Sequence, residues 1–403
     1  MSDSRSATAN EGTASPRREL LSHERSIDDE GVVSESTSWQ LSDEEADRLE
    51  RLQTRFAEVR PLVERRTDDP IGAVWSELER FTGTDAVSRA LQNRSGGRKP
   101  NAWQVMKVRQ AIRLASAYFA SYRNADPLIA PPQLYYGAMH LAEAVAFLTL
   151  RRALPQSHGT YAPTTNGSLR DATIVFEGFG TQQALSGALG GDQLGAHGSA
   201  AATISVFELL RSLPDMHQTM EELTGEGTRA FPVFRVSDPD PKLERAATIG
   251  ARLTGGEAIG PRVHVALPIS DLLTSDAVED ELAIYPALMD RHAVSDGNGN
   301  LCWRARGARE DDFRTLTLST PYGFFFERRL SNGAYLPEMS IILALLHFVS
   351  TLSRYRALEW MRLLDDRSDD FSIIRDLLAI SEKKMANLAL NELTQRVYDF
   401  QHT

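Results

Sequence analysis

An arginine and a histidine in the first half of the chain have the types and the spacing that phosphate chemistry needs. Five residues separate Arg152 from His158, at the predicted end of an apolar helix. A histidine can act as general base or acid and an arginine can hold phosphoryl oxygens, which is the arrangement of metal-independent RNA cleavage. Alternatively, Arg151 and Arg152 satisfy the last helical carbonyl groups and residues 157–159 form the exit turn. We favour this structural interpretation.

A second set of polar side chains lies on the helix before that turn. His140 and Glu143 are three residues apart and Tyr136 is one turn earlier, so all three share a face. A buried set of this kind could do acid–base work, because burial moves pKa values toward neutrality. A satisfied hydrogen-bond network that fixes helix packing is the interpretation we prefer.

Charged and aromatic residues also alternate near the C-terminus. On one predicted helix, Tyr355 and Glu359 share a face, and so do Arg356 and Trp360. Ordinary packing, including a cation–π contact, explains this pattern. A ligand-binding surface that includes Arg354 on the same face is the alternative.

The sequence lacks the strong catalytic and nucleotide-binding motifs. It has no G-x-x-x-x-G-K-[ST] loop, no H-E-x-x-H motif and no G-x-S-x-G motif. In the nearest dinucleotide-like pattern, residues 178–183, Gln183 replaces the third glycine, so we interpret the segment as a flexible loop. Asp369 and Asp370 follow a predicted N-cap, Ser368, and complement a helix dipole rather than a metal ion. We therefore expect neither a metal nor a cofactor.

The composition is that of an acidic, folded protein. The 403 residues are 42% hydrophobic and 25% charged, with a formal net charge of −11, which does not steer the chain toward nucleic acid or an anionic membrane. Cys302 is the only cysteine, which suits a reducing compartment. The most apolar run, residues 339–349, is shorter than the ~20 residues that cross a bilayer, and the N-terminus shows no signal peptide. We expect a cytoplasmic protein without membrane contact.

Residue types divide the chain into four predicted regions. Residues 1–40 are poor in aliphatic side chains and predict a disordered acidic tail. Residues 41–160 and 336–403 have the apolar periodicity of helices, whereas residues 161–335 hold short β-rich runs and glycine-rich loops. The predicted fold class is α+β and predominantly helical, with N- and C-terminal helical bundles around a small, mainly antiparallel β-rich middle.

Individual elements can be placed within these regions. The helix over residues 133–152 is apolar nearly all round, so we expect it at the centre of a bundle. Further helices are expected from Ser42 and over residues 71–91, 102–123, 276–290, 337–364 and 369–399. Short strands are expected over residues 173–177, 231–236, 262–267, 302–305, 314–318 and 322–327.

Three stretches of the sequence together resemble a known family. The first holds Leu134-Tyr135-Tyr136-Gly137, Leu141, Ala144 and Ser157-His158-Gly159, and the second is Leu210-Arg211-Ser212-Leu213-Pro214-Asp215. The third and most specific holds Leu336-Pro337-Glu338, Leu345-Leu346, Ser353-Arg354-Tyr355, Glu359-Trp360, Leu363-Leu364, Asp370, Ile374, Leu377-Leu378, Ile380 and Lys384. These segments resemble the YaaC-like family over roughly residues 70–400. The resemblance implies a bacterial cytosolic protein without an established activity.

The helix with paired tyrosines that ends in a Ser-His turn is also similar to helices of HEPN-type domains. Those domains include ribonucleases with an arginine and a histidine at this spacing, and inactive binding versions. We expect a non-catalytic binding or regulatory protein of bacterial stress or phage defence. The alternative is a HEPN-like ribonuclease in which His158 is the acid/base and Arg152 holds the phosphate; RNA is a partner only in that case. The sequence identifies no partner, so a homodimer and a different protein partner both stay open.

Overall fold

The computed structural model describes much of the chain from residue 60 onward. The described residues are 60–94, 96–151, 154–155, 157–163, 168–196, 199–236, 264–267, 292–295, 301–304, 317–320, 323–366 and 368–402. The predicted tail, the helix predicted to open at Ser42, the helix predicted over residues 276–290 and Arg152 lie outside them.

The N-terminal helical region is divided by short breaks. Its elements are α2 (Pro70–Glu79), the 3-10 helix η1 (Arg80–Thr82), α3 (Thr84–Arg94), α4 (Ala102–Arg123) and α5 (Ala130–Leu150). The prediction of a single helix over residues 71–91 is wrong. Gly83 has extended backbone (φ −87°, ψ 147°) and separates η1 from α3. The prediction of α4 is confirmed. Asn101 starts it with a capping box, in which its side chain accepts from the Gln104 N–H and the Gln104 side chain accepts from the Asn101 N–H.

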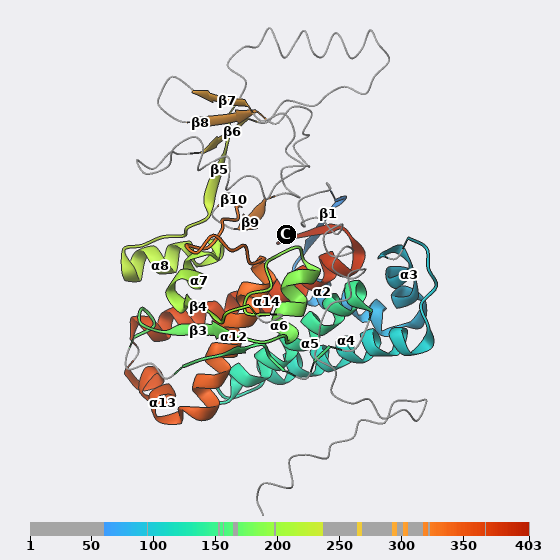
Figure 1. Ribbon diagram of the computed structural model, residues 1–403, viewed down its shortest axis with the longest axis horizontal. Coiled ribbons are helices and arrows are strands. Elements are labelled where there is room, and N and C mark those ends of the chain that lie inside the picture. Colours follow the sequence, from blue (N-terminus) through green and yellow to red (C-terminus); the bar gives the residue numbers. More distant parts are fainter. Residues whose placement is uncertain are drawn as a thin grey trace, which may run out of the picture. The chain divides into compact units, whose positions relative to one another are not determined.

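Helix α5 is the central helix, as predicted. It contacts α4, α6, α12 and α14, and most of its residues are buried (Figure 1). Its prolines stand in the first turn, where no backbone N–H is needed for the helix. It ends at Leu150 because Arg151 adopts the left-handed conformation (φ 58°).

The C-terminal helices differ from the prediction in two respects: the helix predicted over residues 337–364 is divided, and the helix predicted over residues 369–399 ends at Thr394, where Gln395 adopts the left-handed conformation (φ 57°). The helices are α12 (Glu338–Tyr355), α13 (Ala357–Asp366) and α14 (Asp369–Thr394). The helix predicted over residues 337–364 is two helices, bent by 105° where Arg356 leaves helical geometry (φ −130°, ψ 49°). Ser368 caps α14 as predicted, since its hydroxyl accepts from the Phe371 N–H.

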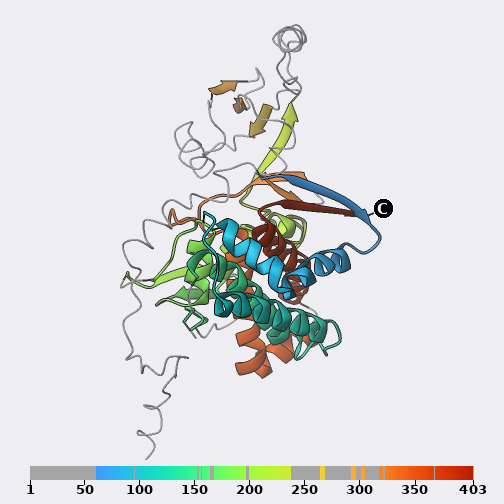
Figure 2. The same ribbon diagram turned by 90° about the vertical axis from the view of Figure 1, so that its right-hand side faces the viewer.

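Two small sheets border the helices. Strand β1 (Leu62–Thr67) pairs in parallel with β11 (Val397–His402), so the first and last described elements lie side by side (Figure 2). Neither strand was predicted from the sequence. Strands β2 (Thr160–Tyr161), β3 (Thr173–Phe176) and β4 (Ala202–Ser205) form an antiparallel sheet.

The β-rich middle contains the largest sheet. Its strand order is β7-β8-β6-β5-β10-β9, and every pair is antiparallel, as predicted. The strands are β5 (Phe231–Val236), β6 (His264–Leu267), β7 (His292–Ser295), β8 (Leu301–Arg304), β9 (Leu318–Thr320) and β10 (Gly323–Phe326). The same region holds α6 (Thr181–Ala188), α7 (Val206–Arg211), the 3-10 helix η2 (Pro214–Met216) and α8 (His217–Thr224). The fold is thus predominantly helical α+β.

Helix α6 replaces the flexible loop expected around Gln183. All eight of its residues are buried, and the Gln183 amide donates to the carbonyls of Gly159 and Leu194. The first N–H groups of α6, on Thr181 and Gln182, donate to the carbonyls of Ser157 and His158 (3.0 and 3.2 Å). The side chain that breaks the dinucleotide-like pattern therefore ties the helix to the turn that follows α5.

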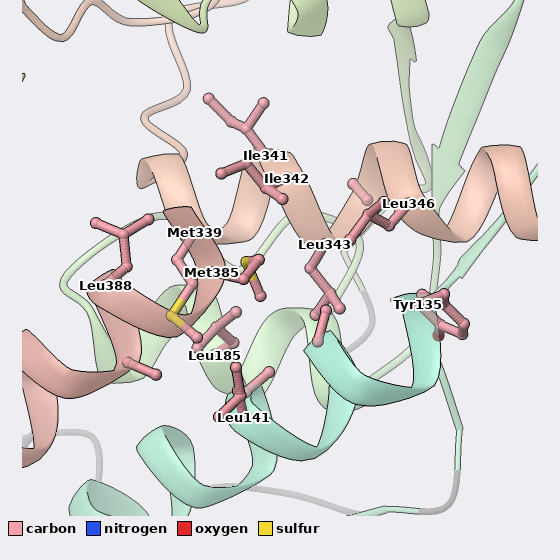
Figure 3. Packing of buried hydrophobic residues seen from close by; sticks show 14 of the residues in the cluster. Tyr135, Leu141, Leu185, Met339, Ile341, Ile342, Leu343, Leu346, Met385 and Leu388 are labelled. Carbon is pink, nitrogen blue, oxygen red and sulfur yellow. The ribbon is translucent and has the colours of Figure 1, made fainter. Parts of the chain in front are cut away.

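One hydrophobic core joins helices from the first half of the sequence to the helices near its C-terminus. Side chains of α12 pack on α5, and those of α14 pack on both (Figure 3). Leu343 of α12 points toward α5, and Met385 and Leu388 of α14 lie near Met339 (Figure 3). Within the described part of the chain no single helix has the length and apolarity to cross a membrane; α12 and α13 meet that test only as a bent pair.

Candidate functional site

The turn after α5 places His158 in a cluster of rings. The Oη of Tyr135 and the Nδ1 of His158 share a hydrogen bond of 2.7 Å. The ring of His347, from α12, lies 5.0 Å from that of His158 and 5.1 Å from that of Tyr135, centroid to centroid. The Nδ1 of His347 and the hydroxyl of Thr160 share a hydrogen bond of 2.9 Å. Tyr135 reaches this place from the stretch of α5 that α12 crosses (Figure 3).

Burial keeps this cluster uncharged at neutral pH. Burial, with smaller contributions from His158 and Arg354, lowers the pKa of His347 to about 3. Burial and the charge of Arg354 also lower the pKa of His158. Burial raises the pKa of the Tyr135 phenol, so it remains protonated. Both imidazoles are therefore neutral, so each ring carries a proton on one nitrogen and a lone pair on the other.

Arg354 extends the cluster toward the surface. Its Nη1 donates to the Oη of Tyr136 (2.8 Å), and its guanidinium lies 5.5 Å from the ring centroid of Tyr136 and 5.0 Å from that of Tyr355. Its Nε donates to the carbonyl of Ser350, which fixes the side chain against its own helix. Tyr355 is 74% exposed. On the side of Tyr355, the guanidinium of Arg354 is therefore covered by a ring that itself lies in solvent.

His140 and Glu143 form a pair on α5, beginning one turn after Tyr136. The Nδ1 of His140 and the Oε2 of Glu143 are 2.7 Å apart. Tyr118 of α4 stands between this pair and Tyr136, with its ring centroid 5.6 Å from each of the rings of His140 and Tyr136. The predicted Tyr136–His140–Glu143 set is thus joined through a residue of another helix. The sequence reasoning missed Tyr118 and did not single out His347 within the apolar run of α12.

The bend at Arg356 changes the predicted C-terminal surface. Tyr355 ends α12 and Glu359 belongs to α13, so they do not share a helix face as the sequence suggested. Trp360 is 2% exposed and its Nε1 donates to the Leu128 carbonyl (3.2 Å), which gives it a structural position. Arg356 Nη1 lies 3.8 Å from Glu359 Oε2.

The predicted arginine–histidine pair is described only in part. Arg152 lies outside the described residues. The guanidinium of Arg151 donates to the Leu91 carbonyl in the last turn of α3. The neighbours that the structure places around His158 are Tyr135 and His347.

A cavity on the other side of the core forms a second candidate site. Its volume is about 710 Å³, and residues of α2, β1, β9, η2, α8, α14 and β11 line it together with the first residue of α12. The chain therefore builds this space from segments that are far apart in the sequence.

Three charged residues meet in the wall of this cavity. The Nζ of Lys384 lies 2.7 Å from Asp215 Oδ2 and 2.9 Å from Glu338 Oε1. The Glu338 side chain is 2% exposed and the Lys384 side chain 17%. Burial opposes the charge of Lys384, but Asp215 and Glu338 together outweigh it and raise the pKa of the ammonium group. Burial, with a smaller effect of Glu338, raises the pKa of Asp215.

Two oxygen atoms of the cavity lining are buried with neither a hydrogen-bond donor nor an ion-pair partner among the described residues, whereas Oδ2 of Asp215 has the ammonium group of Lys384 beside it. The two atoms are Oε2 of Glu338 and Oδ1 of Asn387. The amide of Asn387 is held in place because its Nδ2 donates to the Tyr398 carbonyl (3.2 Å). Buried acceptors are usually satisfied in folded proteins, so these two atoms call for a donor that the described residues do not supply.

The sequence contained a signal for this second site. Asp215 belongs to the second of the three stretches that carry the family resemblance, and Glu338 and Lys384 belong to the two ends of the third. The reasoning from single motifs assigned none of them a role. Across the part of the chain that the structure describes, no group of three or more His, Cys, Asp or Glu side chains is arranged to hold a metal ion.

Comparison with known proteins gives one match. The family model described as YaaC-like Protein matches residues 81–393, which include all the residues of the ring cluster and the three charged residues. No curated protein and no solved structure matches the chain. The resemblance to HEPN-type domains therefore has no support beyond the short sequence pattern. Because the family model covers most of the chain, this protein belongs to the YaaC-like family.

Proposed function

We propose that this YaaC-like protein is a non-catalytic binding protein that takes a small ligand into the cavity beside Lys384. The single observation behind the proposal is the cavity of about 710 Å³ with two unsatisfied buried acceptors in its wall. Ligand pockets in proteins have this size and this combination of apolar walls with a few oriented polar groups. A regulatory role in bacterial stress or phage defence, in the cytoplasm, belongs to the same proposal and rests on the sequence resemblances.

The chemistry of the wall favours binding over catalysis. Lys384 is held as an ammonium ion between two carboxylates, so it is not the neutral amine that a nucleophile or base requires. The residues that line the described cavity include neither histidine nor cysteine. Its side chains can position a ligand by charge and by hydrogen bonds.

A substitution that fills the cavity tests the proposal. Ala379 lines the cavity from α14 and is exposed at its mouth, so Ala379→Trp would place an indole in the opening. We expect members of a fragment library to raise the Tm of the wild-type protein and to lose this effect with Ala379→Trp. Arg375→Trp, at an exposed position of α14 that does not line the cavity, is the matched control and should keep the effect. A library without any Ala379-dependent ligand would contradict the proposal.

The ribonuclease alternative keeps one specific observation in its favour. His158 is partly buried, has a lowered pKa and lies beside a second neutral imidazole, so it could act as a base near neutral pH. The test is RNA cleavage by the wild-type protein, His158→Ala, Arg152→Ala and the control His140→Ala. Cleavage that is lost in both His158→Ala and Arg152→Ala but retained in His140→Ala would support the ribonuclease alternative. No cleavage, or equal cleavage by all four, removes it.

A further inference from the structure

We infer that the cavity beside Lys384 binds a small organic cation, in which an ammonium group is carried on an apolar chain or ring. This inference rests on the proposed function, because it names the ligand class of the same cavity. It is argued from the net charge of the buried wall, from the type of the unsatisfied atoms and from the apolar surface next to them.

The buried charges of the wall do not balance. Lys384 contributes one positive charge, and Asp215 and Glu338 contribute one negative charge each when ionised, so the group carries one net negative charge. Charges taken out of water are unfavourable unless they are paired. A ligand with one positive charge would complete the pairing.

The rest of the charged lining has the same sign. The cavity is lined by six carboxylates and two ammonium groups, those of Asp68, Asp69, Asp215, Glu338, Asp376, Asp399, Lys383 and Lys384. Asp69 caps α2 and Asp376 accepts from the Thr219 hydroxyl, so these two groups have local partners as well. Even so, the field inside the cavity favours a cation over an anion.

The unsatisfied atoms require a donor. Oε2 of Glu338 and Oδ1 of Asn387 are both acceptors, and Glu338 is 2% exposed. An ammonium group has three N–H donors for acceptors of this kind, whereas an ionised carboxylate ligand has none. A hard metal ion would need several oxygens around one point, and the described side chains offer no such group.

The remaining wall fits an apolar body. Aliphatic and aromatic side chains of β1, α2, α14 and β11 line the cavity, among them Leu62, Ile71, Leu388 and Val397. Contact with these side chains would bury the hydrocarbon part of the ligand while its charged end reaches Glu338.

Four probes of equal chain length test the ligand class. They are hexylamine, 1,6-diaminohexane, hexanoate and 1-hexanol, each titrated into the full-length protein and followed by calorimetry and by Tm. We expect hexylamine to bind about tenfold more tightly than 1-hexanol, because hydrogen bonds between charged groups are stronger than those between neutral ones. Hexanoate should bind most weakly of the four.

Variants connect this preference to the named residues. Glu338→Gln removes the net charge, and it should abolish most of the roughly tenfold advantage of hexylamine over 1-hexanol. If that variant does not fold, Ser319→Asp and Ser319→Lys at the exposed rim of the cavity take its place; they should tighten and weaken hexylamine binding, respectively. Glu382→Gln is the control on α14, since Glu382 pairs with Arg123 outside the cavity and should leave the preference unchanged.

The outcomes separate this inference from the proposed function. Binding of hexanoate or 1-hexanol at least as tight as that of hexylamine, and lost in Ala379→Trp, overturns the cation inference and leaves a binding cavity. If neither Ala379→Trp nor the charge variants at Glu338 and Ser319 affect hexylamine binding, the amine binds elsewhere. That result also overturns the cation inference. Displacement of hexylamine by micromolar Ca²⁺ would show a metal site instead. If no probe and no library fragment depends on Ala379, the proposed function fails as well.

Discussion

At the scale of single residues, the structure separates two kinds of buried polar group. His347 and Tyr135 are kept neutral mainly by burial, so the free energy that each costs the fold depends on pH. Asp215, Glu338 and Lys384 remain close enough to pair as ions. The neutral groups lie between two packed helices, whereas the three charged groups line a cavity. We therefore assign ligand binding to the charged groups.

The neutral histidine makes the protein less stable in mild acid. The pKa of His347 falls from 6.5 to about 3 on folding, so the unfolded chain binds the proton more readily between these values. Stability should therefore be lost as the pH falls below 6.5, by about 2 kcal/mol between pH 7.5 and pH 5. His347→Asn should reduce that loss, and His140→Asn, which replaces a histidine outside the ring cluster, should not. Urea unfolding at the two pH values measures it, and an equal pH dependence in His347→Asn would contradict the assignment.

At the scale of the elements, α13 is anchored after the bend by a buried tryptophan, with two partly buried leucines, Leu363 and Leu364, packed beside the core. Trp360 of α13 is 2% exposed and donates to the Leu128 carbonyl just before α5, whereas its neighbour Leu358 is 75% exposed. The α13 face that carries Leu358 is not held by the core. The face of α13 that carries Trp360 therefore holds the helix to the core.

Truncation of that anchor should be costly. We expect Trp360→Ala to lower the free energy of unfolding by about 3–5 kcal/mol, because it leaves a cavity and an unpaired Leu128 carbonyl. Leu358→Ala should change it by about 0.5 kcal/mol or less, since that side chain is in solvent. Chemical denaturation compares the two. Similar losses for both variants would show that α13 is held in some other way.

At the scale of the whole molecule, the two ends of the described chain are held together by charge as well as by β1–β11 pairing. Glu392 of α14 accepts from Arg60 (2.7 Å) and from Arg94 (2.8 Å), and its side chain is 6% exposed. These residues lie before β1, at the end of α3 and near the end of α14. Their ion pairs are therefore near β1 and β11, which also contribute residues to the cavity lining.

Loss of this acidic group should destabilise the closure. Glu392→Ala leaves two largely buried guanidinium groups without their carboxylate, so we expect a loss of about 3 kcal/mol in the free energy of unfolding. Glu382→Ala, which removes the partner of the more exposed Arg123, should cost at most about 1 kcal/mol. Hydrogen exchange should further show faster exchange in β1 and β11 of the first variant only. An unchanged exchange rate there would separate this ion cluster from the strand pairing.

The sequence by itself determined features that depend on residues close along the chain. The capped start of α14 at Ser368, the long α4 and the apolar α5 follow from local caps, turns and periodicity, and the short β-rich runs with turns between them predicted the antiparallel sheet in the middle of the chain. The membership of the YaaC-like family was also readable from short segments. Local interactions of this kind act over a few residues, so the pattern reveals them directly.

Only the tertiary structure decided which distant residues meet. The parallel pairing of β1 with β11, the bend at Arg356, the ring cluster of His158 with His347, and the charged wall formed by Asp215, Glu338 and Lys384 all join separate segments. Such contacts form because the apolar faces of α5, α12 and α14 have to be buried together, and that packing brings polar side chains into place with them. The spacing of residues along a chain carries no direct record of that packing.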